Sequence, residues 1–244
     1  MGYKYASISK KGSDKERNED FIGILELEDG ILCIVCDGLG GGLAPRKASE
    51  FCVKSIQSYF LESNKKNHLS KIKESIITAN AELFGMSISS EKFKGMATTS
   101  DVFFLNNHTA FWGHIGDSRI YHLKNDKLYQ LTKDHSLVQQ MVDRGYISMK
   151  AASKHPNKNV IMSALGESLN IDIDSSKLIL DTKASHRFMI CSDGVNAVIG
   201  KKELETILKE NDLNKCIDTL DKKVQSAGAP DDYSIIIIER TNLI

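Results

Sequence analysis

The first clear pattern along the chain is a pair of apolar runs, each of the length of a β-strand. One run spans residues 21–27, the other spans residues 31–36, and Asp29-Gly30 lies between them. Asp-Gly between two apolar runs is typical of a tight turn that joins antiparallel strands. We therefore predict a β-hairpin whose two open ends lie side by side at one edge of a sheet.

Carboxylates stand at the open ends of this hairpin. Glu19 and Asp20 precede the first strand, and Asp37 directly follows the second. Because antiparallel pairing brings those ends together, the hairpin predicts three neighbouring carboxylates. Glycines at 38 and 40–42 follow, and they would let the backbone approach whatever Asp37 holds.

The rest of the chain contains further strands and helices in groups. Short runs of β-type residues between turn residues predict strands at 3–7, 97–105, 109–115, 118–123, 127–131, 176–181, 187–191 and 233–239. Apolar residues repeated every three or four positions predict helices at 45–60, 69–83, 136–144, 201–210 and 213–227. This order predicts an α+β fold in which two antiparallel sheets pack together, with helix pairs outside, in one domain spanning 1–244.

One long stretch, residues 145–172, follows neither the strand pattern nor the helix pattern. It is mixed and largely polar, and it is longer than most connections between elements in a compact domain. Long insertions of this kind are often functional. We predict that this stretch is irregular and forms a mobile flap near the functional site rather than part of the core.

Composition and charge exclude several classes of function. The 244 residues include 32 Lys+Arg and 32 Asp+Glu without a basic block, so we expect no nucleic-acid partner. The apolar runs are too short to cross a bilayer, so we expect no membrane partner. The first twenty residues lack the apolar segment of a secretory signal, and we therefore expect a cytoplasmic protein.

The cysteines indicate buried, reduced thiols rather than a reactive centre. There are five, an odd number, and they lie mostly within apolar runs, as in cytosolic proteins. Cys33 and Cys36 have a zinc-like spacing, but within one strand they point to opposite faces, and no second Cys/His pair follows. No cysteine has arginine six residues later, which excludes the phosphate loop of a cysteine phosphatase.

Acidic residues recur at the ends of apolar strands, mostly beside glycine or a turn. Like charges that lie close together raise one another's pKa, so such a cluster stays ionised only with a counterion. A divalent cation meets this need, and ligands that are all oxygen favour Mg²⁺ or Mn²⁺ over zinc. The residues concerned are Glu19, Asp20, Asp37, Asp117, Asp193, Asp231 and Asp232.

Eight short motifs follow one another along nearly the whole chain. They are NED (18–20), DGLGG (37–41), GMATT (95–99), GHIGDSRIY (113–121), LTKDHS (131–136), HPNKNVIMSALG (155–166), CSDGV (191–195) and PDDYSIIII (230–238). In this order they resemble the metal-dependent protein phosphatase family (type 2C) in its compact bacterial form. The resemblance implies a four-layer α/β/β/α sandwich. It also implies a serine/threonine protein phosphatase, active in signalling, in which a hydroxide bridging two metals attacks the phosphomonoester directly.

The resemblance further implies a role for individual residues. Asp37 would bridge two Mn²⁺ or Mg²⁺ ions, and the Gly38 carbonyl would bind one of them. Asp193 and Asp231 would complete the shell of the other ion, so that these two residues and Asp37 are the catalytic carboxylates. Glu19 would hold the second ion through water.

Three more acidic residues receive supporting roles from the resemblance. Asp20 would support the second metal from nearby, and Asp117 would contribute to a third, weaker metal site. Asp232 stands where the family usually has asparagine, which adds a charge near the metals. Of the adjacent pair, Asp231 is the preferred ligand.

The groups that bind phosphate and protonate the leaving group stay open. Family members usually have arginine where this chain has Lys15, and lysine offers a point charge in place of a planar fork. Arg17 is the nearby alternative as a phosphate ligand. His114, His135 and His155 are candidates for protonating the leaving alkoxide, and the sequence does not separate them.

The resemblance also implies a partner, and it leaves two alternative functions. The expected substrate is a phosphorylated protein, with the enzyme opposing a serine/threonine kinase, and we expect a monomer. One alternative is a phosphatase-fold binding module with weak or no turnover, which the change to Lys15 favours. The other is a phosphatase for small phosphoesters, which the shape of residues 145–172 would distinguish.

Overall fold

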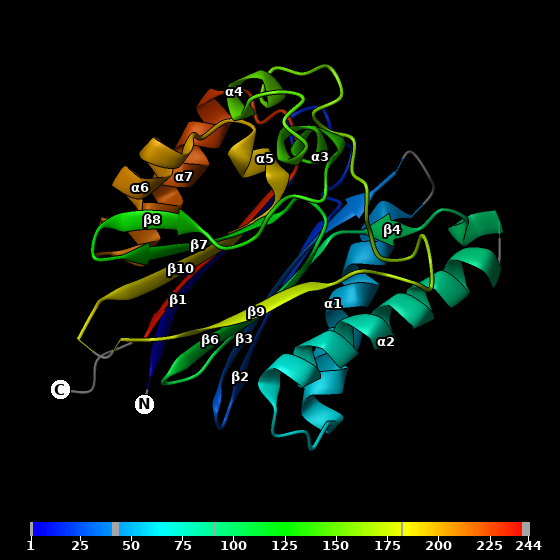
Figure 1. The fold of residues 1–244 in the computed structure, drawn as a ribbon, viewed down its shortest axis with the longest axis horizontal. Helices are drawn as coiled ribbons and strands as arrows, with labels where there is room; N and C mark the ends of the chain where they lie inside the picture. The colour runs from blue at the N-terminus through cyan, green and yellow to red at the C-terminus, as the bar shows by residue number, and fades with distance from the viewer. Residues whose placement is uncertain (1, 41–43, 90, 182, 241–244) are drawn as a thin grey trace.

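Two antiparallel β-sheets lie face to face at the centre of the protein (Figure 1). The computed structural model describes residues 2–40, 44–89, 91–181 and 183–240. The five-stranded sheet contains, in hydrogen-bonded order, β1 (Tyr3–Lys10), β11 (Tyr233–Arg240), β10 (His186–Cys191), β7 (Arg119–Lys124) and β8 (Lys127–Gln130). The six-stranded sheet contains β2 (Asp20–Leu27), β3 (Gly30–Leu39), β5 (Ser100–Leu105), β6 (Thr109–Ile115) and β9 (Asp174–Ile179), and β4 (Ala97–Thr98) pairs with β3.

Helices cover the outer faces of both sheets (Figure 1). On the six-stranded sheet lie α1 (Pro45–Glu62) and α2 (His68–Ser89), followed by the short 3₁₀ turn Glu91–Phe93. On the five-stranded sheet lie α5 (Asp193–Asn196), α6 (Lys201–Ile207) and α7 (Leu213–Ser226). The four layers confirm the predicted α+β sandwich. Across the described residues, no helix has the length and apolar character that crossing a membrane requires.

Strand β3 shows how the sequence produces these layers. Ile31, Cys33 and Val35 point into the apolar core between the two sheets. Leu32 and Ile34 alternate with them and pack under α1 and α2. All five side chains are fully buried. A strand that is covered on both faces must be apolar at every position, which explains the continuous apolar run in the sequence.

The predicted hairpin is confirmed. β2 ends at Leu27 and β3 begins at Gly30, so the turn lies where the Asp-Gly signal places it. The strands pair antiparallel in a register that sets Asp20 directly opposite Asp37. The hairpin therefore delivers its carboxylates to one edge of the sheet. Two of the predicted glycines, 41 and 42, lie outside the described residues.

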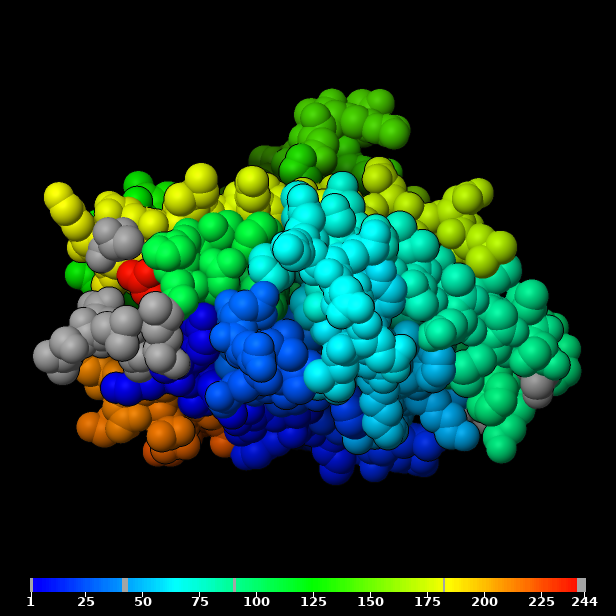
Figure 2. Space-filling model, turned by 90° about the horizontal axis from the view of Figure 1, so that it is seen from below, coloured from blue at the N-terminus to red at the C-terminus, as the bar shows by residue number. Residues whose placement is uncertain are grey.

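The stretch 145–172 is not irregular throughout. It contains the short helix α4, which Ser148 caps by accepting a hydrogen bond from the amide of Ala151. Leu165 forms an isolated β-bridge with Thr98 and so fastens the end of the stretch to β4. Figure 2 shows that the segment around α3 and α4 projects from the rest of the surface. The bounds of these helices are Leu137–Asp143 for α3 and Met149–Ala152 for α4.

Two buried histidines form a hydrogen-bonded pair on the five-stranded sheet. His122 Nε2 lies 2.8 Å from His186 Nδ1, and His186 Nε2 lies 2.9 Å from the carbonyl oxygen of Asp181. Because that carbonyl can only accept, His186 carries its proton on Nε2, and His122 donates to its Nδ1. Burial, together with the nearby His186 and Lys124, lowers the pKa of His122 to about 4. The pair is therefore held neutral in the folded protein.

We expect His122 to contribute a loss of stability as the pH falls from about 6.5 toward 4. The unfolded chain binds a proton at His122 at higher pH than the folded chain does, so protonation favours unfolding. His122→Gln keeps a donor toward His186 and should reduce this loss. Urea unfolding of both proteins at pH 7 and pH 5 measures the effect as the difference between their pH dependences, and the same change of stability with pH in both proteins would contradict the assignment.

Candidate metal centre

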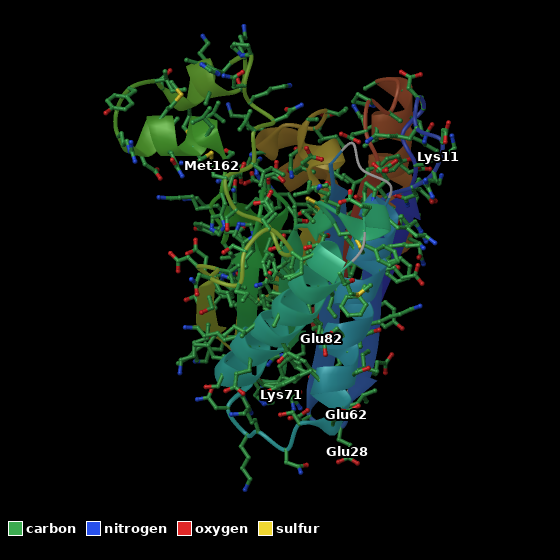
Figure 3. The ribbon with its side chains drawn as sticks, turned by 90° about the vertical axis from the view of Figure 1, so that its right-hand side faces the viewer. Lys11, Glu28, Glu62, Lys71, Glu82 and Met162 are labelled. Carbon is green, nitrogen blue, oxygen red and sulfur yellow. The ribbon has the colours of Figure 1, made fainter. Side chains whose placement is uncertain are left out.

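A cavity of about 250 Å³ opens where the end of β3, the start of α5 and the turn before β11 meet. It lies near the loop that carries Lys11 and the segment that carries Met162. Figure 3 shows both residues at the end of the molecule opposite Glu28 and Lys71. The structure brings five predicted carboxylates to this cavity, together with Lys15 and the predicted backbone ligand Gly38. The five are Glu19, Asp37, Asp117, Asp193 and Asp231.

The backbone around Asp37 is held in place by threonines of the GMATT motif. The amide of Asp37 donates to the Thr99 hydroxyl at 2.9 Å, and the carbonyl of Asp37 accepts from the Thr99 amide and the Thr98 hydroxyl, each at 2.8 Å. The amide of Gly38 donates to the carbonyl of Glu19 at 3.2 Å. These bonds fix the backbone of Asp37 and Gly38 at the sheet edge, so that the side chain of Asp37 starts from a defined position.

Ser192 joins the two sheets behind the cavity. Its hydroxyl donates to Asp20 Oδ2 at 2.7 Å and accepts from the amide of Ser234 at 2.9 Å. Asp20 belongs to the six-stranded sheet and Ser234 to the five-stranded sheet. Sequence reasoning gave Ser192 no role, although it lies in the CSDGV motif. Ser192 therefore fixes the position of the following residue, Asp193, relative to Asp20.

The carboxylates around the cavity resist ionisation in the absence of a cation. Burial is the largest cause, and it raises the pKa of Asp20 and of Asp117 to about 7 and that of Asp193 to about 6. Burial and the charges of neighbouring aspartates raise the pKa of Asp37 well above its usual value. Ionised together, these groups would carry more negative charge than the surrounding protein neutralises.

Several oxygens of this cluster lack a hydrogen-bond partner within the part of the chain that the structure describes. They are buried and include Asp20 Oδ1, Asp117 Oδ1 and Asp193 Oδ1. A buried acceptor without a partner costs about 1–3 kcal/mol, and more when it is charged. Oxygens that are free, buried and anionic suit a hard divalent cation. The donor set thus fits Mg²⁺ or Mn²⁺.

The side chains are not yet arranged as a completed metal shell. Among the described residues, no group of three or more His, Cys, Asp or Glu side chains is already placed to hold a metal ion. An ammonium group stands among them instead, because Lys15 Nζ lies 2.8 Å from Asp231 Oδ1 and 3.6 Å from Glu19 Oε2. Burial alone would lower the pKa of Lys15, but the hydrogen bond to Asp231 and the surrounding carboxylates raise it. The cavity lining and the unpartnered oxygens still suit a divalent cation, because a bound cation relieves the repulsion between carboxylates that line one cavity.

Asp232 binds backbone amides and does not line the cavity. It is 2% exposed, and its two oxygens accept from the amides of Gly12 and Glu19 at 2.8 and 2.7 Å. Neighbouring Asp231 has a side chain that is 43% exposed and lines the cavity. Asp232 therefore fastens the loop of Lys15 to the turn before β11, and the geometry leaves Asp231 as the candidate ligand of the pair.

The remaining candidates lie away from the cavity. Arg17 is exposed and does not line it. His114 is fully buried and paired with Asp101 at 2.8 Å. His135 lies 3.2 Å from Asp174, and His155 accepts from the backbone of its own loop. None of these three histidines reaches the cavity.

A neighbouring cavity of about 310 Å³ lies between the carboxylates and the projecting segment. Asp117 and Asp193 form one wall, and Met149 and Lys158 of the segment form another. Arg119 also lines it and is paired with Asp134 at 2.6 Å. The metal centre therefore continues into a groove that is large enough for more than a phosphate group.

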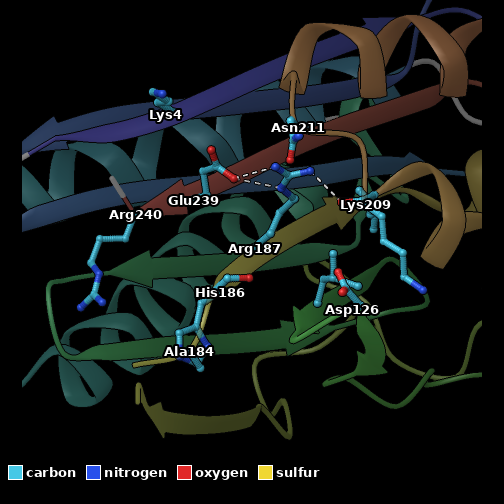
Figure 4. Close-up of a pocket in the computed structure, with 12 residues that line it drawn as sticks. Lys4, Asp126, Ala184, His186, Arg187, Lys209, Asn211, Glu239 and Arg240 are labelled. Carbon is cyan, nitrogen blue, oxygen red and sulfur yellow. Dashed lines mark hydrogen bonds and ion pairs between the residues drawn. The ribbon is translucent and has the colours of Figure 1, made fainter. Parts of the chain in front are cut away.

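A third cavity, of about 340 Å³, lies at the opposite end of the five-stranded sheet. Figure 4 shows Arg187 at its centre, with Glu239 and Asn211 beside it. The guanidinium donates to Glu239 at 3.0 and 2.8 Å and to the carbonyl of Leu208 at 2.6 Å. Its most buried cation is thus already paired, and the carboxylate cluster remains the better candidate for chemistry.

Comparison with known proteins shows similarity along almost the whole chain. The family model described as "Protein phosphatase 2C" matches residues 10–227. The "Serine/threonine phosphatase stp" of Listeria monocytogenes serotype 4b is 32% identical over 236 residues, covering 94% of this chain and 93% of the relative. The crystal structure of Stp1 from Staphylococcus aureus has a TM-score of 0.92 at 25% identity and covers 99% of this chain and 96% of that one. The catalytic domain of PstP, solved with two manganese ions, has a TM-score of 0.86 at 23% identity and covers 98% and 99%.

Asp232→Asn should lower the free energy of unfolding by about 1–3 kcal/mol. The two oxygens of Asp232 accept from two backbone amides. Asparagine has one side-chain oxygen, so its NH₂ group would face the second amide and two donors would meet. Asp231→Asn, one residue earlier and partly exposed, is the matched control and should cost much less. Urea denaturation of the metal-free proteins measures both changes, and equal stabilities would show that Asp232 does not fasten the loop.

Proposed function

The chain belongs to the protein phosphatase 2C family, and we propose that it removes phosphate from serine and threonine side chains of proteins at the carboxylate cluster around Asp37. It is a metal-dependent serine/threonine phosphatase. One observation carries the assignment to this cluster, namely that five carboxylates converge on one cavity while buried oxygens among them lack partners. This arrangement favours turnover over simple phosphopeptide binding, because a binder gains nothing from carboxylates that repel a phosphate.

Two Mn²⁺ or Mg²⁺ ions fit this set of oxygens. The catalytic domain of PstP, which has a similar fold, was solved with two manganese ions. In the proposed assignment Asp37 would hold both ions, and Asp193 and Asp231 would hold one of them. The Gly38 carbonyl would bind the other ion directly, and Glu19 would hold it through water. Asp117 is the proposed ligand of a third, weaker site.

Asp20 acts as a support in this proposal. It lies opposite Asp37 in the sheet, and Ser192 holds one of its oxygens. Its carboxylate is fully buried and does not line the cavity. We infer that Asp20 orients the metal ligands around it from behind.

The protein contributes position and charge to the reaction. The ions, when bound, supply the positive charge that activates a water and neutralises the phosphate oxygens. Hydrogen bonds to Thr98 and Thr99 hold the backbone of Asp37 at the edge of the cavity, so this part of the chain needs no rearrangement during catalysis. The described cavity lining contains no cysteine, serine or histidine that could act as a nucleophile, and its carboxylates are assigned to metal binding in this proposal. We therefore infer direct attack by water on phosphorus, without a phospho-enzyme.

The surroundings of the centre suggest how a protein substrate binds. Lys15 lines the cavity and is the proposed ligand of the substrate phosphate, whereas Arg17 does not reach it. The adjoining groove under α3 and α4 would receive the polypeptide around the phosphorylated residue. We propose that residues 145–172 act as a mobile flap over this groove and that residues 1–244 work as a single domain. An opposing serine/threonine kinase in the cytoplasm is the proposed source of the substrate.

Asp37→Asn and Asp193→Asn should each lower kcat by at least about a hundredfold, the range expected when one preorganised electrostatic contact is lost. Both variants should remain folded, since removing one charge from the cluster relieves repulsion. Asp218→Asn, on the exposed face of α7, is the control and should behave as the unmodified protein. Hydrolysis of a phosphothreonine peptide with Mn²⁺ measures the effect, and a folded Asp37 variant with substantial activity would refute the ligand assignment.

Activity should vanish in excess chelator and survive thiol alkylation. The proposed metal ligands are all oxygen atoms, so alkylation of thiols leaves them intact. All five cysteines are also buried. Burial also raises the pKa of thiols such as Cys36 and Cys191, so little reactive thiolate forms. Full activity with chelator present, or rapid inactivation by iodoacetamide, would contradict this account.

A further inference from the structure

Lys15 places a cation of the protein itself among the proposed metal ligands. Its ammonium group lies 2.8 Å from Asp231 and 3.6 Å from Glu19. The side chains of Lys15 and Asp231 are 36% and 43% exposed, so the pair lies at the cavity mouth and not in the core. The pair can therefore open while the fold around it stays intact.

The backbone that carries Lys15 is fixed, so the side chain is the part that can move. Asp232 holds the amides of Gly12 and Glu19, on either side of Lys15. Gly12 packs so closely on the turn that a Cβ there would lie 2.7 Å from the backbone carbon of Asp231. The loop and the turn thus form one unit. Within it, the flexible stem of lysine lets the ammonium change partners inside the cavity.

We propose that Lys15 is an exchangeable counterion that pairs with Asp231 in the metal-free protein and turns to the substrate phosphate once metal occupies the site. This deepens the proposed function and rests on it. An ammonium and a divalent cation at the same carboxylate repel each other, so metal at Asp231 displaces Lys15. A phosphate held beside the metals then offers the displaced ammonium a new anionic partner.

Two opposite effects on binding follow from this exchange. Without phosphate, Lys15 competes with the metal for Asp231 and weakens metal binding. With metal bound, Lys15 is free to contact phosphate and strengthens its binding. A lysine with a purely structural role would produce neither pattern, since its loss would loosen the site for metal and phosphate together.

Calorimetric titration of the metal-free protein with Mn²⁺ tests the first effect. Lys15→Met should bind Mn²⁺ about two- to fivefold more tightly, which is the range for loss of a partly exposed ion pair. Lys15→Arg keeps the charge and should stay close to the unmodified protein. Lys10→Met is the matched control, because it removes an ion pair of the same 2.8 Å length, to Asp221, that does not line the cavity.

Titration of the Mn²⁺-loaded proteins with orthophosphate tests the second effect. Lys15→Met should bind phosphate more weakly than the Lys10→Met control. Unchanged or weaker Mn²⁺ binding in Lys15→Met, or unchanged phosphate binding, would overturn the proposal. If Mn²⁺ and phosphate respond as described but phosphopeptides are not hydrolysed, the proposed function fails and the counterion exchange stands. If no variant binds Mn²⁺, both fail.

Discussion

Repulsion between carboxylates at one end of the sandwich is the constraint on which the rest of this structure depends. Burial and mutual proximity raise the pKa of Asp20, Asp37, Asp117 and Asp193 together. A fold that holds these four carboxylates together must offset their repulsion with stabilising interactions elsewhere, and it must leave room for a cation. In this phosphatase both requirements are met by the same architecture, because the strands that form the core also end at the cavity.

The apolar layers oppose this repulsion. Buried residues fill the space between the sheets and the space under each helix pair, and β3 contributes to two of these layers through its alternating side chains. Ser192 then links the two sheets at the cavity itself. Hydrogen bonds from Thr98 and Thr99 hold the end of β3. Rigid strand ends therefore place the ligands, while flexible side chains such as Lys15 adjust to what is bound.

Much of this arrangement could be predicted from the sequence because it follows from local rules. The Asp-Gly turn between two apolar runs was enough to bring Glu19, Asp20 and Asp37 to one edge of a sheet, and the structure adds the register that sets Asp20 opposite Asp37. The contact between Ser192 and Asp20 depends on how two sheets approach each other, and no local pattern encodes it. The different roles of Asp231 and Asp232 arise from the shape of the turn before β11. This turn directs Asp231 to the cavity and Asp232 to the amides of Gly12 and Glu19, and no local sequence pattern shows which residue goes where.

The structure of the segment over the groove also could not be predicted fully from the sequence. Residues 145–172 lack a long periodic pattern, so the one-turn helix α4 could not be foreseen, since its stability comes from a cap and from contacts with α3. The motif resemblance pointed to Lys15 as a phosphate ligand. Its pairing with Asp231 is a tertiary contact that only the structure reveals.

A crystal structure of the protein soaked in Mn²⁺, with anomalous diffraction measured at the manganese edge, tests the central claim most directly. The account predicts two strong anomalous peaks that share the carboxylate of Asp37, with Asp193 and Asp231 around one of them and Lys15 turned away from Asp231. Absence of manganese from this cavity, or ions bound without contact to Asp37, would contradict it.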